Sequence, residues 1–157
     1  MNEVTKQKGQ TVIETALMMI LILILFFGIA EIARAWYLKN SLSNAARVGV
    51  RVAIVEAITP DTQTKPASPP SDCSGLTGND KVFCAVWNTS GLPADATAII
   101  AITNDVSPSG ASPGDTVQVT VTGTFTTVVP GLASMAQGLI PGETGSLLQA
   151  QAVMRHE

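Results

Sequence analysis

Three sets of side chains in this sequence are of types that can carry chemistry: a glutamate inside an apolar stretch, a pair of cysteines and a single histidine. Glu14 lies directly before a long run of apolar residues. An ionised, unpaired carboxylate in such surroundings costs roughly 2–3 kcal/mol or more, so a partner for Glu14 is expected. Cys73 and Cys84 could form a disulfide or supply a thiol, and His156 offers one imidazole near the end of the sequence.

These residues are too few for the common kinds of catalytic or metal site. Two cysteines exclude a disulfide-dense miniprotein and a four-cysteine zinc site. Outside the cytoplasm a Cys73–Cys84 disulfide is expected, and the alternative of a reactive thiol has only Lys81 as a basic neighbour. His156 is expected to be solvated or to cap the last strand. Since no serine or cysteine has another histidine to pair with, we predict no enzyme activity, no cofactor and no metal site.

Charge and hydrophobicity are unevenly distributed over the 157 residues. Charged residues make up 13% of the chain, about half the usual share, and 46% hydrophobic residues exclude disorder throughout. Residues 32–51 carry four basic side chains and no acid, whereas residues 52–154 carry eight acids against Lys65 and Lys81. An acidic C-terminal part argues against nucleic-acid binding. The two segments are either separately solvated or attract each other between neighbouring copies.

The N-terminal segment contains sixteen consecutive uncharged residues, TALMMILILILFFGIA, at positions 15–30. Spanning a hydrocarbon core of ~30 Å takes about 20 residues, a length reached by extending the run back to Gly9 across Glu14. Three interpretations are open. One is a secretory signal, with Lys6 and Lys8 at its start and a small-x-small site at positions 33–35. The second is a plain transmembrane anchor, and the third is a leader that is removed while the helix is retained.

The third interpretation is carried by the residues around Gly9. Lys8-Gly9 is followed by Gln10-Thr11-Val12-Ile13-Glu14, which resembles a type IV prepilin signal. The resemblance implies cleavage between Gly9 and Gln10 by a prepilin peptidase, which Gly9 helps by letting a protease approach the backbone. Glu14 would then neutralise the new amine of Gln10 in a neighbouring subunit. Breaking such a desolvated pair costs about 3–5 kcal/mol, which would fix the register between subunits.

Basic residues flank the apolar run on both sides. Lys6 and Lys8 precede it, and the four basic residues of the 32–51 segment follow it, so the positive-inside rule does not favour a cytoplasmic N-terminus. We nevertheless predict that the N-terminus is inside, because of the leader resemblance and the two cysteines.

One long helix is predicted from about residue 11 to residue 57, since no strong stop signal appears before Thr59-Pro60. Its length would be ~70 Å. The alternative is an anchor followed by a separate amphipathic helix. In the second half, apolar or small residues recur at helical spacing and polar residues line another face. The first face holds Leu38, Leu42, Ala45, Gly49, Val52 and Ala53, and the second holds Asn40, Asn44, Arg47 and Arg51.

The residues after this helix predict a small head that is rich in β-sheet. Residues 60–72 contain four prolines and indicate a loop. A short helix capped by Asn79-Asp80 is predicted between the cysteines, and another at residues 132–139. Strands are predicted at 96–103, 116–126 and 146–155, the second with strict alternation of valine and polar residues. The fold class is therefore α+β: a long N-terminal helix whose second half packs on a small antiparallel sheet.

The whole pattern resembles the TadE-like minor pilins (pseudopilins) of tight-adherence, Flp-type pili, most clearly at residues 8–53 and 149–157. The carrying segments are KNSLSNAARVGVRVA and the ending AQAVMRHE. Thr15 stands where the major pilins have tyrosine, which favours the minor branch. The resemblance implies a leader at 1–9, a helix at 10–59 and an extracytoplasmic head at 60–157.

The resemblance also implies a cellular role. The expected partners are other pilin subunits, the prepilin peptidase, the pilus assembly machinery and the membrane. The precursor would lie in the inner membrane, and the assembled subunit in a surface pilus used in adhesion or secretion. The alternative function is a membrane-anchored periplasmic binding module with no role in a filament.

Overall fold

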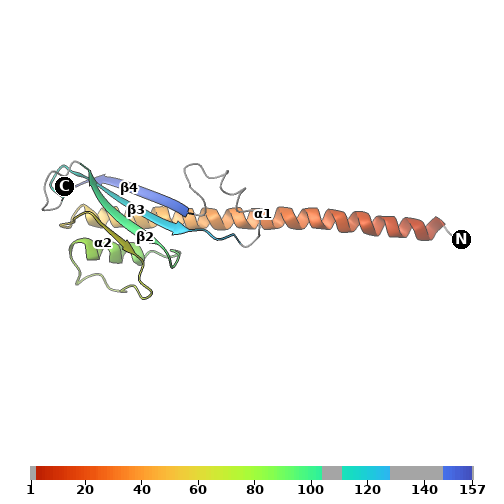
Figure 1. Cartoon of the computed structure of the whole chain (residues 1–157), viewed down its shortest axis with the longest axis horizontal. Helices are drawn as coiled ribbons and strands as arrows, with labels where there is room; N and C mark the ends of the chain where they lie inside the picture. The colour runs from red at the N-terminus through yellow and green to blue at the C-terminus, as the bar shows by residue number, and fades with distance from the viewer. Residues whose placement is uncertain (1–2, 104–110, 128–146, 157) are drawn as a thin grey trace.

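A single long helix, α1, runs from a free N-terminal part into a small head (Figure 1). The computed structural model describes residues 3–103, 111–127 and 147–156, with residues 3–9 as backbone only. Helix α1 covers Glu3–Ala53, 51 residues, which corresponds to about 77 Å. It passes through both Gly28 and Gly49 without a break, so the continuous helix is confirmed and the two-helix alternative is wrong.

Helix α1 ends one turn before the expected end at Ala57. Ile54 still donates to the carbonyl of Val50, at 3.1 Å, but Val55 donates to Val52, at 3.2 Å. This shift from a four-residue to a three-residue hydrogen bond tightens the last turn, as is usual at helix termini. Ile58, in the segment that follows, is fully buried in the hydrophobic core.

The head contains one antiparallel sheet of four strands in the order β1-β2-β3-β4. The strands are β1 (Asp61–Thr64), β2 (Thr97–Thr103), β3 (Thr116–Thr124) and β4 (Leu147–Arg155). The last three match the predicted strands to within two residues at each end, and the α+β class is confirmed. Strand β1 corrects the prediction of a loop over residues 60–72. Its four residues pair with β2, Asp61 opposite Ile100. The helix predicted at 132–139 lies outside the described residues.

The alternation of β3 places one face in the core. Val117, Val119 and Val121 are fully buried, as the period of two requires. On β4, Leu148 and Ala150 are buried on the same face, since Val121 is the register partner of Ala150. The inward faces of the two strands therefore form a continuous apolar surface.

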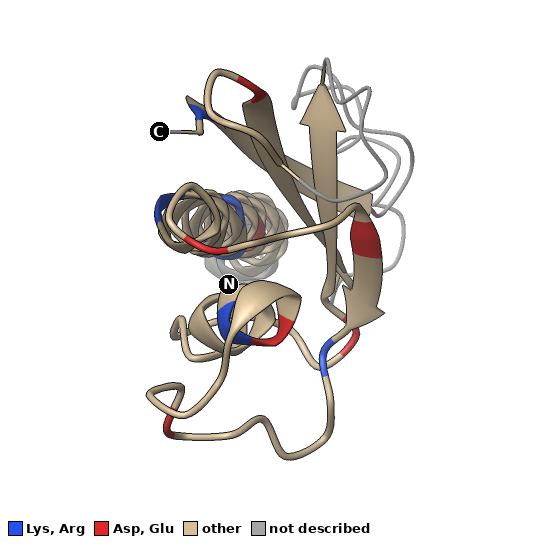
Figure 2. Cartoon of the chain, turned by 90° about the vertical axis from the view of Figure 1, so that its left-hand side faces the viewer, with Lys and Arg blue, Asp and Glu red and all other residues tan. Residues whose placement is uncertain are grey.

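The short helix α2 (Gly78–Trp87) packs beside α1 on the same face of the sheet (Figure 2). The short helix predicted between the cysteines is thus present, and it buries Val82, Phe83, Val86 and Trp87. The predicted cap by Asn79-Asp80 is wrong, because Thr77 precedes the helix and makes no side-chain capping bond. The amide of Asn79 instead joins Thr59, accepting from its backbone N–H and donating to its hydroxyl, both at 3.0 Å.

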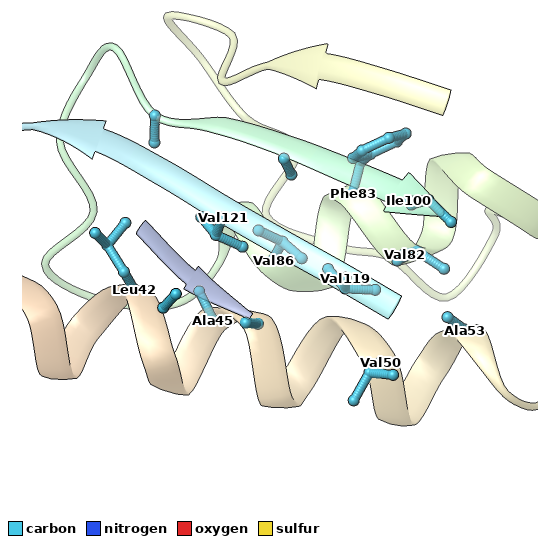
Figure 3. Packing of buried hydrophobic residues seen from close by; sticks show 14 of the residues in the cluster. Leu42, Ala45, Val50, Ala53, Val82, Phe83, Val86, Ile100, Val119 and Val121 are labelled. Atoms are coloured by element: carbon cyan, nitrogen blue, oxygen red, sulfur yellow. The ribbon is translucent and has the colours of Figure 1, made fainter. Parts of the chain in front are cut away.

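The second half of α1 lies against β3, β4 and α2, and small residues make this approach close. Figure 3 shows Val86 of α2 and Val119 of β3 meeting above α1. A methyl group on Gly49 would lie 2.6 Å from a γ-carbon of Val86 and 3.0 Å from one of Val119. Ala45 and Ala46 are fully buried on the same side, and Arg47 is exposed. The predicted amphipathic faces are confirmed.

Candidate functional site

The N-terminal part of α1 is an apolar shaft, defined here as residues 10–30. Apart from half-buried Gly28, every residue of the shaft is exposed. The large side chains include Ile13 at 70% and Phe26 at 72% exposure. From Ala16 onward every residue is apolar, and consecutive residues are exposed, so this part of the shaft is apolar around its whole circumference. Such a surface is far beyond the patch sizes that monomeric soluble proteins expose. By length and composition Gln10–Ala53 contains a segment apolar enough to cross a membrane. The shaft needs lipid or other helices to cover it.

Gln10 and Glu14 lie one helical turn apart near the free end of the shaft. Both side chains are exposed and, four residues apart, lie on the same face of α1. Among the described residues no side chain pairs with Glu14. Thr15 satisfies its own hydroxyl by donating to the carbonyl of Thr11, at 2.9 Å. The structure therefore leaves the Glu14 carboxylate available to a group outside this chain. Gly9 lies within the same helix, next to Gln10.

Burial along α1 begins abruptly at the end of the shaft, with Glu31, which is only 7% exposed. Its carboxylate accepts a bond from the guanidinium of Arg34, at 3.1 Å. The same guanidinium lies over the ring of Phe125, 5.8 Å from the ring centroid. Trp36 and Tyr37, 65% and 64% exposed, follow on the outer side of the helix. A charged and aromatic collar thus separates shaft from head, made of Glu31, Arg34, Trp36, Tyr37 and Phe125.

Polar bonds from α1 to distant segments add to the apolar packing of the head. The ammonium of Lys39 donates to the carbonyl of Gln149 on β4, at 2.5 Å. The hydroxyl of Ser41 donates to the carbonyl of Ser90, at 2.6 Å. These bonds fix the rotation of the helix relative to the head. They therefore fix which faces of the shaft lie below which parts of the head.

At the far end of the head, Glu56 connects the end of α1 to the start of α2. Its carboxylate accepts bonds from the ammonium of Lys81, at 2.5 Å, and from the backbone N–H of Gly78, at 3.2 Å. These two bonds hold the pKa of Glu56 below its usual value, the Lys81 bond contributing most. The pair is a partly buried structural connection.

His156 has a structural place in the same region. Its backbone N–H donates to the carbonyl of Asp115, at 2.7 Å, and its carbonyl accepts from Gly114, at 3.0 Å. The ring nitrogen Nε2 lies 3.4 Å from the carbonyl oxygen of Glu56. His156 thus extends the pairing of β4 by one residue. Within the described ranges, no three histidine, cysteine, aspartate or glutamate side chains gather where they could hold a metal ion.

The two cysteines are joined in a disulfide, with an S–S distance of 1.99 Å and their Cα atoms 5.8 Å apart. Cys84 lies on α2 and is almost fully buried, whereas Cys73 lies in the preceding loop. The expected pairing is therefore present. It ties the proline-rich loop to the helix that packs beside α1.

Sequence reasoning missed the collar as a unit. Glu31 and Arg34 are three residues apart, the spacing of neighbours on a helix, and that signal was present. The contact of Phe125 with Arg34 could not be found from sequence spacing, because Phe125 directly follows β3 and is far from Arg34 in the chain.

Comparison with protein families identifies the part of the chain that carries these features. Residues 9–51 match the model of the family described as TadE-like protein. The match begins at Gly9 and takes in the shaft, the collar segment of α1 and most of the packed half of the helix. No curated protein and no solved structure matches the chain. Residues 9–51, in the N-terminal helix, therefore form a TadE-like domain, and this match supports an association of the chain with the Tad pilus.

Proposed function

We propose that this chain is a structural minor pilin, or pseudopilin, of a Tad (Flp-type) pilus. Residues 1–9 are a leader that a prepilin peptidase removes between Gly9 and Gln10. Residues 10–59 insert first in the membrane and then between other pilin subunits. Residues 60–157 form a head outside the cytoplasm, and the mature subunit takes part in pilus assembly, adhesion or secretion. The role is that of a building block, with no catalytic step.

The observation that carries the proposal is the shaft, an apolar helix exposed around its whole circumference. A helix with one apolar stripe would suit a soluble core, whereas a helix apolar on every face suits lipid and then a bundle of like helices. When the helix moves from the lipid into the bundle, its apolar side chains stay out of water throughout. The family match over residues 9–51 covers the shaft from its first residue.

Glu14 gives the assembly its register. Inside a bundle of shafts the Glu14 carboxylate is desolvated. Cleavage creates a positively charged amine at Gln10, and the amine of a neighbouring helix lies near enough to the same end of the bundle to pair with this carboxylate. A buried charge left without its partner costs about 3–5 kcal/mol, so a subunit shifted along its neighbour is disfavoured. Exposed Arg47 and Arg51 on α1, together with the acidic head of a neighbouring copy, add a weaker attraction that salt would screen.

The disulfide supports a head outside the cytoplasm, since such bonds persist in oxidising compartments. With the helix crossing the membrane once, the N-terminus is then inside, where a prepilin peptidase acts.

The decisive experiment is mass spectrometry of the mature N-terminus, with protein purified from its native envelope. A chain that starts at Gln10 supports the proposal. A chain that starts at Trp36 would mean that the shaft is a discarded secretory signal. An intact Met1 would mean a simple membrane anchor, and the alternative function as a periplasmic binding module would replace the proposal.

A second experiment tests the role of Glu14. We expect Glu14→Gln to be cleaved normally and to remain in the membrane fraction, but to be lost from sheared pili. Thr15→Val is the matched control, because it changes a neighbouring polar group on the same turn without removing a charge, and it should assemble. Normal assembly of the Glu14→Gln variant would contradict the proposed pairing with the amine.

A further inference from the structure

We infer that the head of the membrane-inserted chain rests directly on the outer surface of the bilayer, with the collar in the lipid headgroup layer and Arg34 bound to lipid phosphate. The inference rests on one element of the proposed function, the insertion of α1 into a membrane. It requires neither leader cleavage nor assembly into a filament.

The first step is the fit between the shaft and the bilayer. Residues 10–30 rise by about 31 Å along the helix axis, and a hydrocarbon core is about 30 Å thick. Glu31, the next residue, is already buried, and Arg34, one turn farther on, lies against Phe125 of the head. No spacer of exposed polar helix separates the apolar shaft from the head, so seating the shaft in the hydrocarbon brings the head against the lipid headgroups.

The second step is the position of the collar. The headgroup layer adds about 5–8 Å on each side of the hydrocarbon. Arg34 lies about 6 Å and Trp36 about 9 Å beyond Ala30, and helical side chains lean toward the N-terminus. The exposed rings of Trp36 and Tyr37 therefore lie at the level where amphipathic aromatic side chains are most stable in a membrane.

The third step is the state of the Arg34 guanidinium. The Glu31 carboxylate takes one of its N–H groups, and the Phe125 ring lies against it, so its orientation is fixed from two sides. The side chain nevertheless stays 52% exposed. An arginine has five N–H donors in a rigid fork that matches phosphate geometry. The collar thus offers an oriented cation with free donors at the height of the lipid phosphates, while the only acid of the collar is already paired.

The test uses the full chain in phosphatidylcholine vesicles and reads the fluorescence of Trp36. Lipids brominated close to the headgroup should quench Trp36 more strongly than lipids brominated at the chain ends. The other tryptophan, Trp87, is 4% exposed inside the head, so the Trp36→Phe variant supplies the background to subtract. The variant Ile20→Trp, made in the Trp36→Phe chain, places a reference tryptophan in the middle of the shaft.

The reference separates two failures. If the tryptophan at position 20 is quenched by chain-end bromines and Trp36 by neither lipid, the shaft is inserted but the head stands off the bilayer, and this inference is wrong. If neither tryptophan is quenched, the helix is not inserted, and the proposed function fails with it.

Lipid selectivity tests Arg34 itself. Brominated phosphatidylglycerol should quench Trp36 more than brominated phosphatidylcholine, with a preference of up to about fivefold for one interfacial cation. Arg34→Gln should remove that preference. The matched control is Arg47→Gln, which removes an exposed arginine from the same helix about 20 Å farther from the shaft, and it should keep the preference. Equal preferences in the two variants would overturn the assignment of phosphate binding to Arg34.

Discussion

Gly49 is the position where one added methyl group tests the packing of three elements at once. In Gly49→Ala the new Cβ would lie 2.6 Å from a γ-carbon of Val86, which belongs to a fully buried and conformationally stiff side chain. Overpacking of this kind costs about 1–3 kcal/mol. Alanine gains about 1 kcal/mol in helix propensity over glycine. The net expectation is a free energy of unfolding lowered by about 1 kcal/mol, or a Tm lower by about 4–8 °C for a head of this size.

A double-mutant cycle with Val86→Ala separates the two opposing effects. Val86→Ala alone should lower the free energy of unfolding by about 2 kcal/mol, because it removes buried methyl groups. In that background the clash with Val86 is relieved, and only the 3.0 Å contact with Val119 opposes the propensity gain. Gly49→Ala should then raise the stability by up to about 1 kcal/mol, so its effect changes sign.

The assay is equilibrium unfolding of the full chain in mild detergent, followed by the fluorescence of buried Trp87. Gly28→Ala is the control in the same helix, since a Cβ at Gly28 meets nothing within 4 Å, and it should not lower the midpoint. A coupling energy below about 0.5 kcal/mol between positions 49 and 86 is what independent sites give, and would refute the close approach.

Three further results are expected. Cys73→Ala should lower the free energy of unfolding by roughly 3 kcal/mol, because it opens the loop that the disulfide to Cys84 closes. Chemical denaturation of the variant and of the reduced and oxidised original protein measures this difference. Thr124→Val should raise the pKa of Asp95, which the Thr124 hydroxyl now holds below its usual value. The lowered pKa of Asp95 stabilises the folded protein above an ordinary aspartate pKa of about 3.9, and this stabilisation is lost as the pH falls through the lowered pKa. NMR titration should show the higher pKa of Asp95 in the variant, and the variant should lose less stability in acid than the original protein does. Leu42→Ala, at a fully buried site, should cost about 2–5 kcal/mol in thermal unfolding.

The sequence allowed most of the fold to be predicted where a hydrophobic period was strong. The shaft and the packed half of α1 followed from uninterrupted apolar residues and then from helical spacing. Strand β3 followed from the alternation that buries Val117, Val119 and Val121. Strand β1 was missed because DTQT contains no apolar residue, and its pairing depends on β2 as a neighbour.

The candidate site was predictable in part for the same reason. Glu14 stands out in sequence because a charge next to an apolar run has an obvious physical cost. The collar does not, since Phe125 reaches Arg34 only after the sheet has formed. Asn79 shows the same limit at a smaller scale. Its type suggested a cap, whereas its amide satisfies Thr59, a partner that the helix pattern does not reveal.

The pairing of α1 with β4 also sets the order in which the molecule can fold. Lys39 and Gln149, which bond to each other, lie 110 positions apart in the chain. Each strand pairs with the next one along the chain, but the apolar side of α1 that holds Leu42 is closed only when β4 arrives. Such contacts between distant segments are slow to form and leave apolar surface exposed meanwhile. If the head is exported as proposed, α1 would already be inserted in the membrane while β4, which completes its core, is still being transported.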